Sequence, residues 1–150
     1  MLIDTQNEFS DAQAVTATAI STNVIDLTLG QSGLTTIDIA TGEPIYLTIL
    51  TTTAAAAVGA ATVTFSLESD STADLATSAT VHWTSAAIGK ATLVAGYTVV
   101  QMAITRGNYE RYLGVRYTVA TGPLTAGAFD AFLSREPHNI VTYNDALSIA

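Results

Sequence analysis

Apolar and polar residues alternate at a two-residue period through most of this 150-residue chain, and that alternation restricts it to strands. Successive side chains of a strand point to opposite faces of a sheet, so alternation indicates one buried and one wet face. The clearest runs place their apolar residues at odd numbers, and we expect these residues to form the core. The runs are 25–29, 45–49, 63–67, 81–83 and 113–119.

Weaker patterns complete the predicted fold, which is all-β: an antiparallel β-sandwich, jelly-roll-like, with an N-terminal arm. Turns containing Gly or Pro separate the runs, and we expect residues 51–61 to form a loop. One helical turn is the most that residues 54–57 or 72–76 can form. Between Val99 and Val100 the apolar parity changes, which indicates a β-bulge or burial on both faces. The weaker strands are predicted at 14–20, 34–39, 91–95, 97–105, 126–133 and 138–143.

Residues 1–13 differ from the rest because they are polar and acidic and lack alternation until Ala12. We expect an arm there that runs over the surface or over a neighbouring subunit. Leu2, Ile3 and Phe9 are apolar residues that a free tail would leave in water, so we expect them in an interface. The remaining residues, 14–150, have the length of a single jelly-roll-like domain. The start has neither the basic nor the apolar region of a signal peptide.

The net charge of −8 is unevenly distributed along the chain. Residues 1–89 carry nine carboxylates and no Lys or Arg, whereas residues 90–150 carry all five basic residues against four carboxylates. Because an acidic chain repels phosphate, we do not expect nucleic acid as a partner. The acidic half either keeps the protein soluble or forms a face that docks on a basic partner.

The longest run without a charged residue, 44–67, has enough residues to cross a bilayer. Its six threonines, its partial alternation and the absence of flanking Lys or Arg favour two strands joined by a loop. We therefore expect no membrane association.

Few residues in the chain are suited to catalysis or metal binding. There is no Cys, and His82 and His138 lie far apart without a third ligand in a recognisable motif. Asp70 and Asp74 lack the carboxylate density, the Gly and the closing Glu of a calcium loop. No nucleophile elbow or phosphate-binding loop occurs. We expect no enzymatic activity, no metal and no cofactor.

Arginine and tyrosine are concentrated in residues 106–119. Both residue types are favoured in interfaces because they offer large contact area and directed hydrogen bonds. The alternative is a wet strand face whose arginines form salt bridges with nearby carboxylates. The candidate contact residues are Arg106, Tyr109, Arg111, Tyr112 and Arg116.

Several blocks of the sequence, in order, resemble the capsid cement (decoration) proteins of the Bordetella-phage type. The first block and the block at 110–119 are the most specific. The blocks are 1–16 (MLIDTQNEFSDAQAVT), 21–27 (STNVIDL), 91–97 (ATLVAGY), 110–119 (ERYLGVRYTV) and 125–133 (TAGAFDAFL).

The resemblance implies a jelly-roll protein of the virion that binds the outer surface of the major capsid protein lattice and strengthens the expanded head. It implies no catalytic residue, and synthesis in the host cytoplasm before assembly. Small Thr and Ala side chains suit a lattice clamp, because flat surfaces approach closely with little rotamer entropy to lose. We expect self-association, with a homodimer favoured over a trimer. The alternative is a receptor- or glycan-binding β module of a tail fibre or adhesin, although repeats and a stalk sequence are absent.

Overall fold

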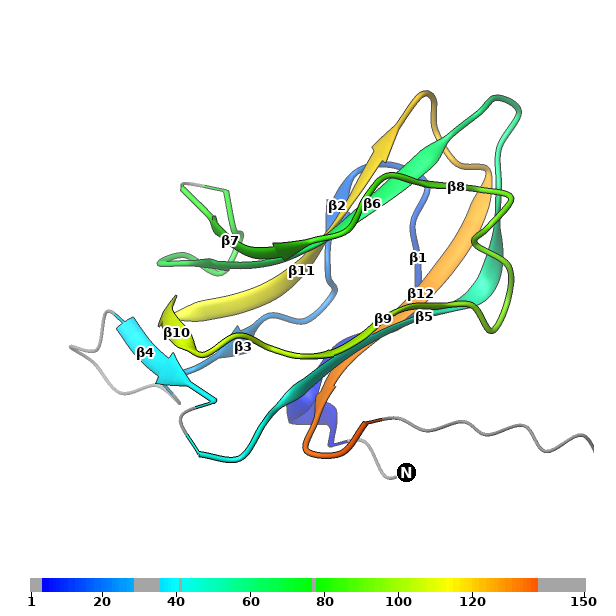
Figure 1. Cartoon of the computed structure of the whole chain (residues 1–150). Coiled ribbons are helices and arrows are strands. Elements are labelled where there is room, and N and C mark those ends of the chain that lie inside the picture. Colours follow the sequence, from blue (N-terminus) through cyan, green and yellow to red (C-terminus); the bar gives the residue numbers. More distant parts are fainter. Residues whose placement is uncertain (1–3, 29–35, 41, 77, 138–150) are drawn as a thin grey trace, which may run out of the picture.

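The computed structural model describes residues 4–28, 36–40, 42–76 and 78–137, and these residues form an antiparallel β-sandwich (Figure 1). A short 3-10 helix, η1 (Thr5–Asn7), precedes the strands. The strands are β1 (Glu8–Ala14), β2 (Ala19–Ile20), β3 (Ile25–Asp26), β4 (Thr36–Ile39), β5 (Tyr46–Ala56), β6 (Thr62–Asp70), β7 (Thr80–Thr84), β8 (Ile88–Gly89), β9 (Thr98–Ala103), β10 (Gly107–Glu110), β11 (Tyr112–Ala120) and β12 (Ala126–Ser134).

Two sheets make up the sandwich, and their strand order is that of a jelly roll. The first sheet has the order β1-β12-β5-β9 and the second has the order β2-β11-β6-β7. Numbered one to eight along the chain, these strands run 1-8-3-6 and 2-7-4-5, which is jelly-roll connectivity. β3 pairs with β11, β8 pairs with β6, and β4 and β10 form a separate pair at one end of the molecule (Figure 1). The predicted fold class is therefore confirmed.

The core lies between the two sheets, and three central strands supply it with odd-numbered residues as predicted. In β5 these are Leu47 and Ile49, and in β6 they include Phe65, all fully buried. Phe65 makes edge contacts with the rings of Tyr117 and Phe129, at centroid distances of 5.7 and 5.0 Å. Such aromatic pairs add about 0.5–1.5 kcal/mol each to the gain from burial. The remaining predicted core residues that are buried are Val63, Leu67, Leu113, Val115 and Tyr117, whereas Ile25, Leu27, Ile45 and Val119 are half-buried, and Leu29 lies outside the described residues.

The odd-numbered prediction is wrong in β7. Leu67 pairs with Trp83 but Glu68 pairs with Val81, so His82 is an extra residue in the ladder. Such a bulge reverses the side-chain alternation on either side of it. Val81 is consequently 54% exposed, and Trp83 is half-buried against the core instead of inside it.

The predicted N-terminal arm is also wrong over its second half, because residues 8–14 form β1 and pair with β12 of the same chain. Phe9 is fully buried in the core, and the Ser10 hydroxyl lies 2.6 Å from the Tyr117 hydroxyl. Two register shifts interrupt the pairing, and Ala12 has a φ of 43°. These irregularities removed the two-residue period by which a strand is recognised. Leu2 and Ile3 lie outside the described residues.

The predicted loop at 51–61 is shorter in the structure, because β5 continues to Ala56. Segments on both sides hold this alanine-rich stretch extended. β12 pairs along one edge, while on the other edge Ala55 N donates to Leu93 O at 2.8 Å. Strand pairing thus overrides the weak intrinsic strand preference of alanine and excludes the helical turn at 54–57.

Among the weaker predictions, 97–105 and 126–133 correspond to β9 and β12. The predicted bulge is present, because Ile49 pairs with Val100 and Leu50 pairs with Thr98, which leaves Val99 between them. Within 14–20 the strand residues are Ala14, the last residue of β1, and β2. β4 occupies 36–39, whereas residues 34 and 35 lie outside the described residues, and 91–95 forms a turn. The predicted strand at 138–143 lies outside the described residues.

Candidate interaction surface

The acidic loop between β6 and β7 has its carboxylates engaged in its own backbone. Asp70 accepts hydrogen bonds from Thr72 N and Ser78 N, both at 3.3 Å. Asp74 accepts one from Thr72 Oγ1 at 2.7 Å. In the described part of the chain, no group of three or more His, Cys, Asp or Glu is placed to hold a metal ion. The hydrogen bonds of Asp70 and Asp74 hold the loop in its conformation.

His82 connects three strands through a stack and a hydrogen bond. Its ring stacks on Tyr109 of β10 with centroids 3.9 Å apart, and its Nε2 lies 2.7 Å from Ser69 Oγ of β6. Ser69 Oγ accepts a hydrogen bond from Glu110 N at 3.0 Å, so its own proton is free to be donated to Nε2. Burial lowers the pKa of His82, and the nearby Glu110 carboxylate partly opposes that shift. This arrangement suits a neutral imidazole that joins β10 to the second sheet.

Arg111 forms a two-armed ion pair with Asp26, in which Nε and Nη2 donate to the two carboxylate oxygens at 3.2 and 2.9 Å. Its guanidinium also lies over the Tyr112 ring, 4.9 Å from the centroid. The hydrogen bonds from Arg111, followed by that from the Thr28 hydroxyl, hold the pKa of Asp26 well below its usual range. The pair joins β3 to the bend between β10 and β11 on a partly exposed surface, where such pairs contribute little to stability.

Arg116 lies in a more buried network on the outer face of the second sheet. Its Nε donates to Glu68 at 2.7 Å, and its Nη2 donates to the carbonyl oxygen of Leu75 at 2.5 Å. Ser66 Oγ donates to the other oxygen of Glu68 at 2.6 Å. The side chain of Leu75 is buried over Gly114, so the β6–β7 loop is fixed on the sheet.

The structure divides the predicted contact residues into accessible and inaccessible groups. Phe9 and Tyr109 are fully buried, so their prediction as contact residues is wrong for this fold. Arg106 is exposed, whereas Arg111, Tyr112 and Arg116 are half-buried in the pairings just described. The alternative of a strand face with salt bridges fits Arg111 and Arg116 better than a free interface patch does.

These pairings also change the picture of the acidic half. Asp26 and Glu68, two of its nine carboxylates, bind arginines from the second half of the chain. Asp70 is fully buried at the base of the loop it caps. The segment that lacks basic residues in the sequence is therefore partly neutralised in the fold.

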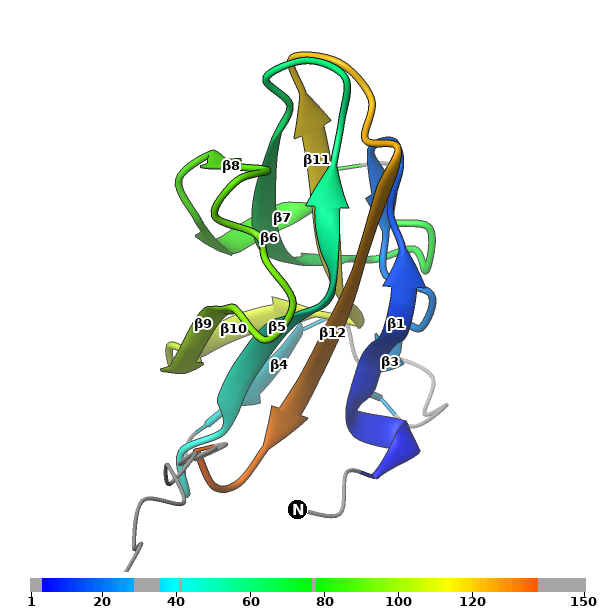
Figure 2. The ribbon, with the colours of Figure 1, turned by 90° about the vertical axis from the view of Figure 1, so that its right-hand side faces the viewer.

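An uncharged surface occurs at one end of the sandwich, where the β5–β6 and β11–β12 turns meet (Figures 1 and 2). Thr125 N donates to Ala56 O at 2.7 Å, which ties the two turns together. Val58, at the apex, is 97% exposed. We call this surface the hairpin tip; it consists of residues 54–60, 91–95 and 121–123. It contains no charged residue. The uncharged, alanine-rich run of the sequence was the signal for it.

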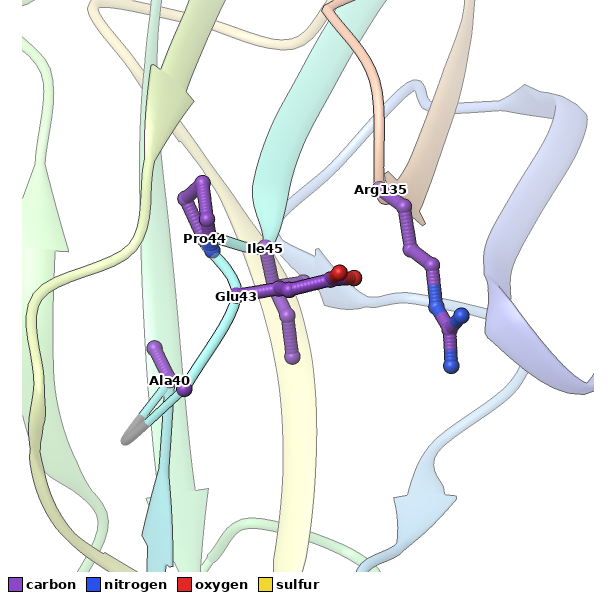
Figure 3. Close-up of a pocket in the computed structure, with 6 residues that line it drawn as sticks. Ala40, Glu43, Pro44, Ile45 and Arg135 are labelled. Carbon is purple, nitrogen blue, oxygen red and sulfur yellow. The ribbon is translucent and has the colours of Figure 1, made fainter.

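A hollow lies at the other end of the molecule, beside the last residues of β12 (Figure 3). Its volume is about 330 Å³. The Glu43 side chain extends toward the side of Arg135, as Figure 3 shows, and Pro44 and Ile45 form the wall between β4 and β5. One carboxylate and one guanidinium without a nucleophile or a second acid do not form a hydrolytic site. The hollow lining is Ala40, Gly42, Glu43, Pro44, Ile45 and Arg135.

Comparison with known proteins gives one family. No curated protein matches the chain. No helix in the described residues is long and apolar enough to cross a membrane. A family model described as Bbp16, a name that points to a Bordetella phage protein, matches residues 9–133, which include all but the first residue of β1 and all but the last of β12. The chain belongs to the Bbp16 family.

Proposed function

We propose that this protein is a structural component of a tailed-phage virion, namely a capsid cement (decoration) protein. The observation that carries the proposal is the Bbp16 match over residues 9–133. Four of the five sequence blocks that resemble phage cement proteins lie wholly or largely within that span. The proposed role is to bind the outer surface of the major capsid protein lattice and stabilise the expanded head.

The chemistry of the described residues supports a binding role. His82, Asp70 and Asp74 all take part in local hydrogen bonds that build the fold. Arg111 and Arg116 are paired with carboxylates of the same chain. On this proposal the protein is not an enzyme and needs no metal or cofactor.

The proposal places the protein on the outside of the capsid after synthesis in the host cytoplasm. Its partners are the major capsid protein and other copies of itself, with a homodimer favoured over a trimer. Nucleic acid and membranes are not expected partners, because the net charge of −8 opposes contact with phosphate. Many copies on one lattice act together, so each contact need only be modest.

The experiment that tests the proposal uses heads from a phage whose gene for this protein carries a stop codon. Purified protein is added, and its copies per head are measured after sedimentation. Saturable binding, with a higher temperature of head rupture, is the expected result. Unexpanded heads serve as the control for binding to the mature lattice.

A protein that ignores heads but binds host cells or immobilised glycans would contradict the proposal. That result would favour the alternative, a receptor- or glycan-binding module of a tail fibre or adhesin. A cryo-electron micrograph of virions locates the protein independently, on the head or on the tail.

A further inference from the structure

We infer that the hairpin tip is the surface that docks on the capsid, and that it fits an uncharged, apolar hollow between shell subunits. This inference rests on the proposed function and adds to it the docking face and the chemistry of the surface it binds.

Two exposed valines belong to the tip, Val58 at its apex and Val94 beside the end of β5. Among the described residues the large hydrophobic side chains that remain exposed are Val58, Val81 and Val94, at 97%, 54% and 53%. Two of the three belong to the hairpin tip. Val94 follows Leu93, whose carbonyl oxygen accepts from Ala55 N three residues before Val58. A side chain as exposed as Val58 is fully available for a partner to cover.

The charge distribution points to the same surface. The chain carries thirteen carboxylates, yet residues 54–60, 91–95 and 121–123 include none. The nearest cation, Lys90, directs its ammonium group to the carbonyl oxygen of Ala57. The cores of protein interfaces are depleted in charge in the same way. Nucleic acids and anionic lipids need free cations, which this surface does not offer.

Hydrogen bonds hold the tip in one conformation. Lys90 N donates to Ala61 O at 3.1 Å, and Thr125 N donates to Ala56 O at 2.7 Å. A Cβ at Gly59 would lie 3.7 Å from the carbonyl oxygen of Thr121, so the two turns approach closely. A surface that is already ordered loses little conformational entropy when it binds.

The shape of the tip favours a shell over a second copy of this chain. The two turns project beyond the rest of the sandwich and form an apex (Figure 2). Two apices that meet end to end bury little area, whereas a stable pair of proteins needs about 800 Å² from each partner. A hollow between subunits encloses an apex on several sides, and the many copies on a lattice add avidity.

Four valine variants test the inference on heads that lack the protein. Val58→Asp and Val94→Asp place a carboxylate in the tip, and Val81→Asp is the matched control. Val81 and Val94 have almost equal exposure, but Val81 lies on β7, away from the tip (Figure 1). We expect each tip variant to lower the bound copies per head at least tenfold at a fixed free concentration. Val81→Asp should stay within twofold of the wild type, and the uncharged Val58→Thr should lose less binding than Val58→Asp, because a hydroxyl costs less to bury than a carboxylate.

The outcomes separate this inference from the proposed function. Heads that bind neither the wild type nor any variant contradict the proposed function itself. Heads that bind Val58→Asp as well as the wild type overturn the docking face and leave the proposed function standing. Cooperative melting of every variant at the wild-type temperature shows that the fold is intact.

Two further measurements test whether the tip binds a second copy of this chain or a bilayer instead of the shell. If Val58→Asp turns a wild-type oligomer into a monomer in sedimentation velocity, the tip binds a second copy and the inference is wrong. If the wild type floats with uncharged phosphatidylcholine vesicles and Val58→Asp does not, the occupant is a bilayer and the inference is wrong.

Discussion

Replacing Gly114 by alanine tests how tightly the β6–β7 loop is fixed on the second sheet. A Cβ at this position would lie 2.7 Å from Leu75 Cδ1 and 3.3 Å from Ser21 Oγ. Carbon atoms in contact prefer a separation of about 3.5–4.0 Å, so Leu75 would have to move by about 1 Å. Leu75 is only 1% exposed, and its carbonyl oxygen is bound by Arg116, so there is little room for that movement.

The expected cost follows from these contacts. Gly114→Ala should lower the free energy of unfolding by about 1–3 kcal/mol, the usual cost of one methyl group too many in a packed site. Leu75→Ala should lower it by about 2–5 kcal/mol, because a buried leucine leaves a cavity. In the double variant the new methyl group occupies part of that cavity. The double variant should therefore lose about 0.5–3 kcal/mol less free energy of unfolding than the sum of the two single losses.

Urea unfolding measures all four proteins of this cycle. The single tryptophan, Trp83, is half-buried on β7 and provides the fluorescence signal. Additive costs, within about 0.5 kcal/mol, would refute the reasoning that Leu75 and Gly114 share one tight contact. Because the hairpin tip is untouched, Gly114→Ala should still bind heads below its melting temperature.

Three other predictions concern buried polar groups. Burial lowers the pKa of His82 from 6.5 in the folded state, so as the pH falls below 6.5 the unfolded chain binds a proton more readily than the folded chain does. The free energy of unfolding should therefore fall with pH in that range, and urea titrations of His82→Gln should lack this contribution to the pH dependence. Tyr117→Phe should cost about 1–3 kcal/mol in thermal unfolding, because it leaves the Ser10 hydroxyl buried and unpaired, and adding Ser10→Ala should recover much of the loss. The buried Thr48 hydroxyl has no hydrogen-bond partner within the described structure, so Thr48→Val should keep or raise the free energy of unfolding by up to about 1 kcal/mol.

The sandwich could be predicted from the sequence because regular strands keep their two-residue period. Leu47, Phe65 and Val115 are buried as their parity requires. The prediction was wrong where the structure inserts an extra residue, at His82 and again in β1. The bulge in β9 was predicted because the apolar parity changes between Val99 and Val100, whereas no such change marks the bulges in β7 and β1.

Ion pairs between residues far apart in the sequence are a second feature that could not be predicted. Arg111 binds Asp26 across 85 residues of sequence, and Arg116 binds Glu68 across 48. A sequence read segment by segment shows an acidic half and an arginine-rich strand but not their neutralisation of each other. The hairpin tip could not be predicted for a different reason: an uncharged, alanine-rich run has the same composition whether it forms a buried strand, a loop or an exposed apex.

The pairing of charges inside the fold bears on how the protein recognises its partner. Of the five basic residues, Arg111 and Arg116 form ion pairs with carboxylates of the same chain, and Lys90 is bound to a backbone carbonyl. The arginines that the sequence offered as interface anchors are thus largely engaged in holding β3, β11 and the β6–β7 loop together. What the described surface offers in their place is an ordered, uncharged apex that carries Val58. If this apex docks on the capsid as proposed, recognition depends on the shape of the hollow that receives it, and such a hollow has the same shape at every lattice position.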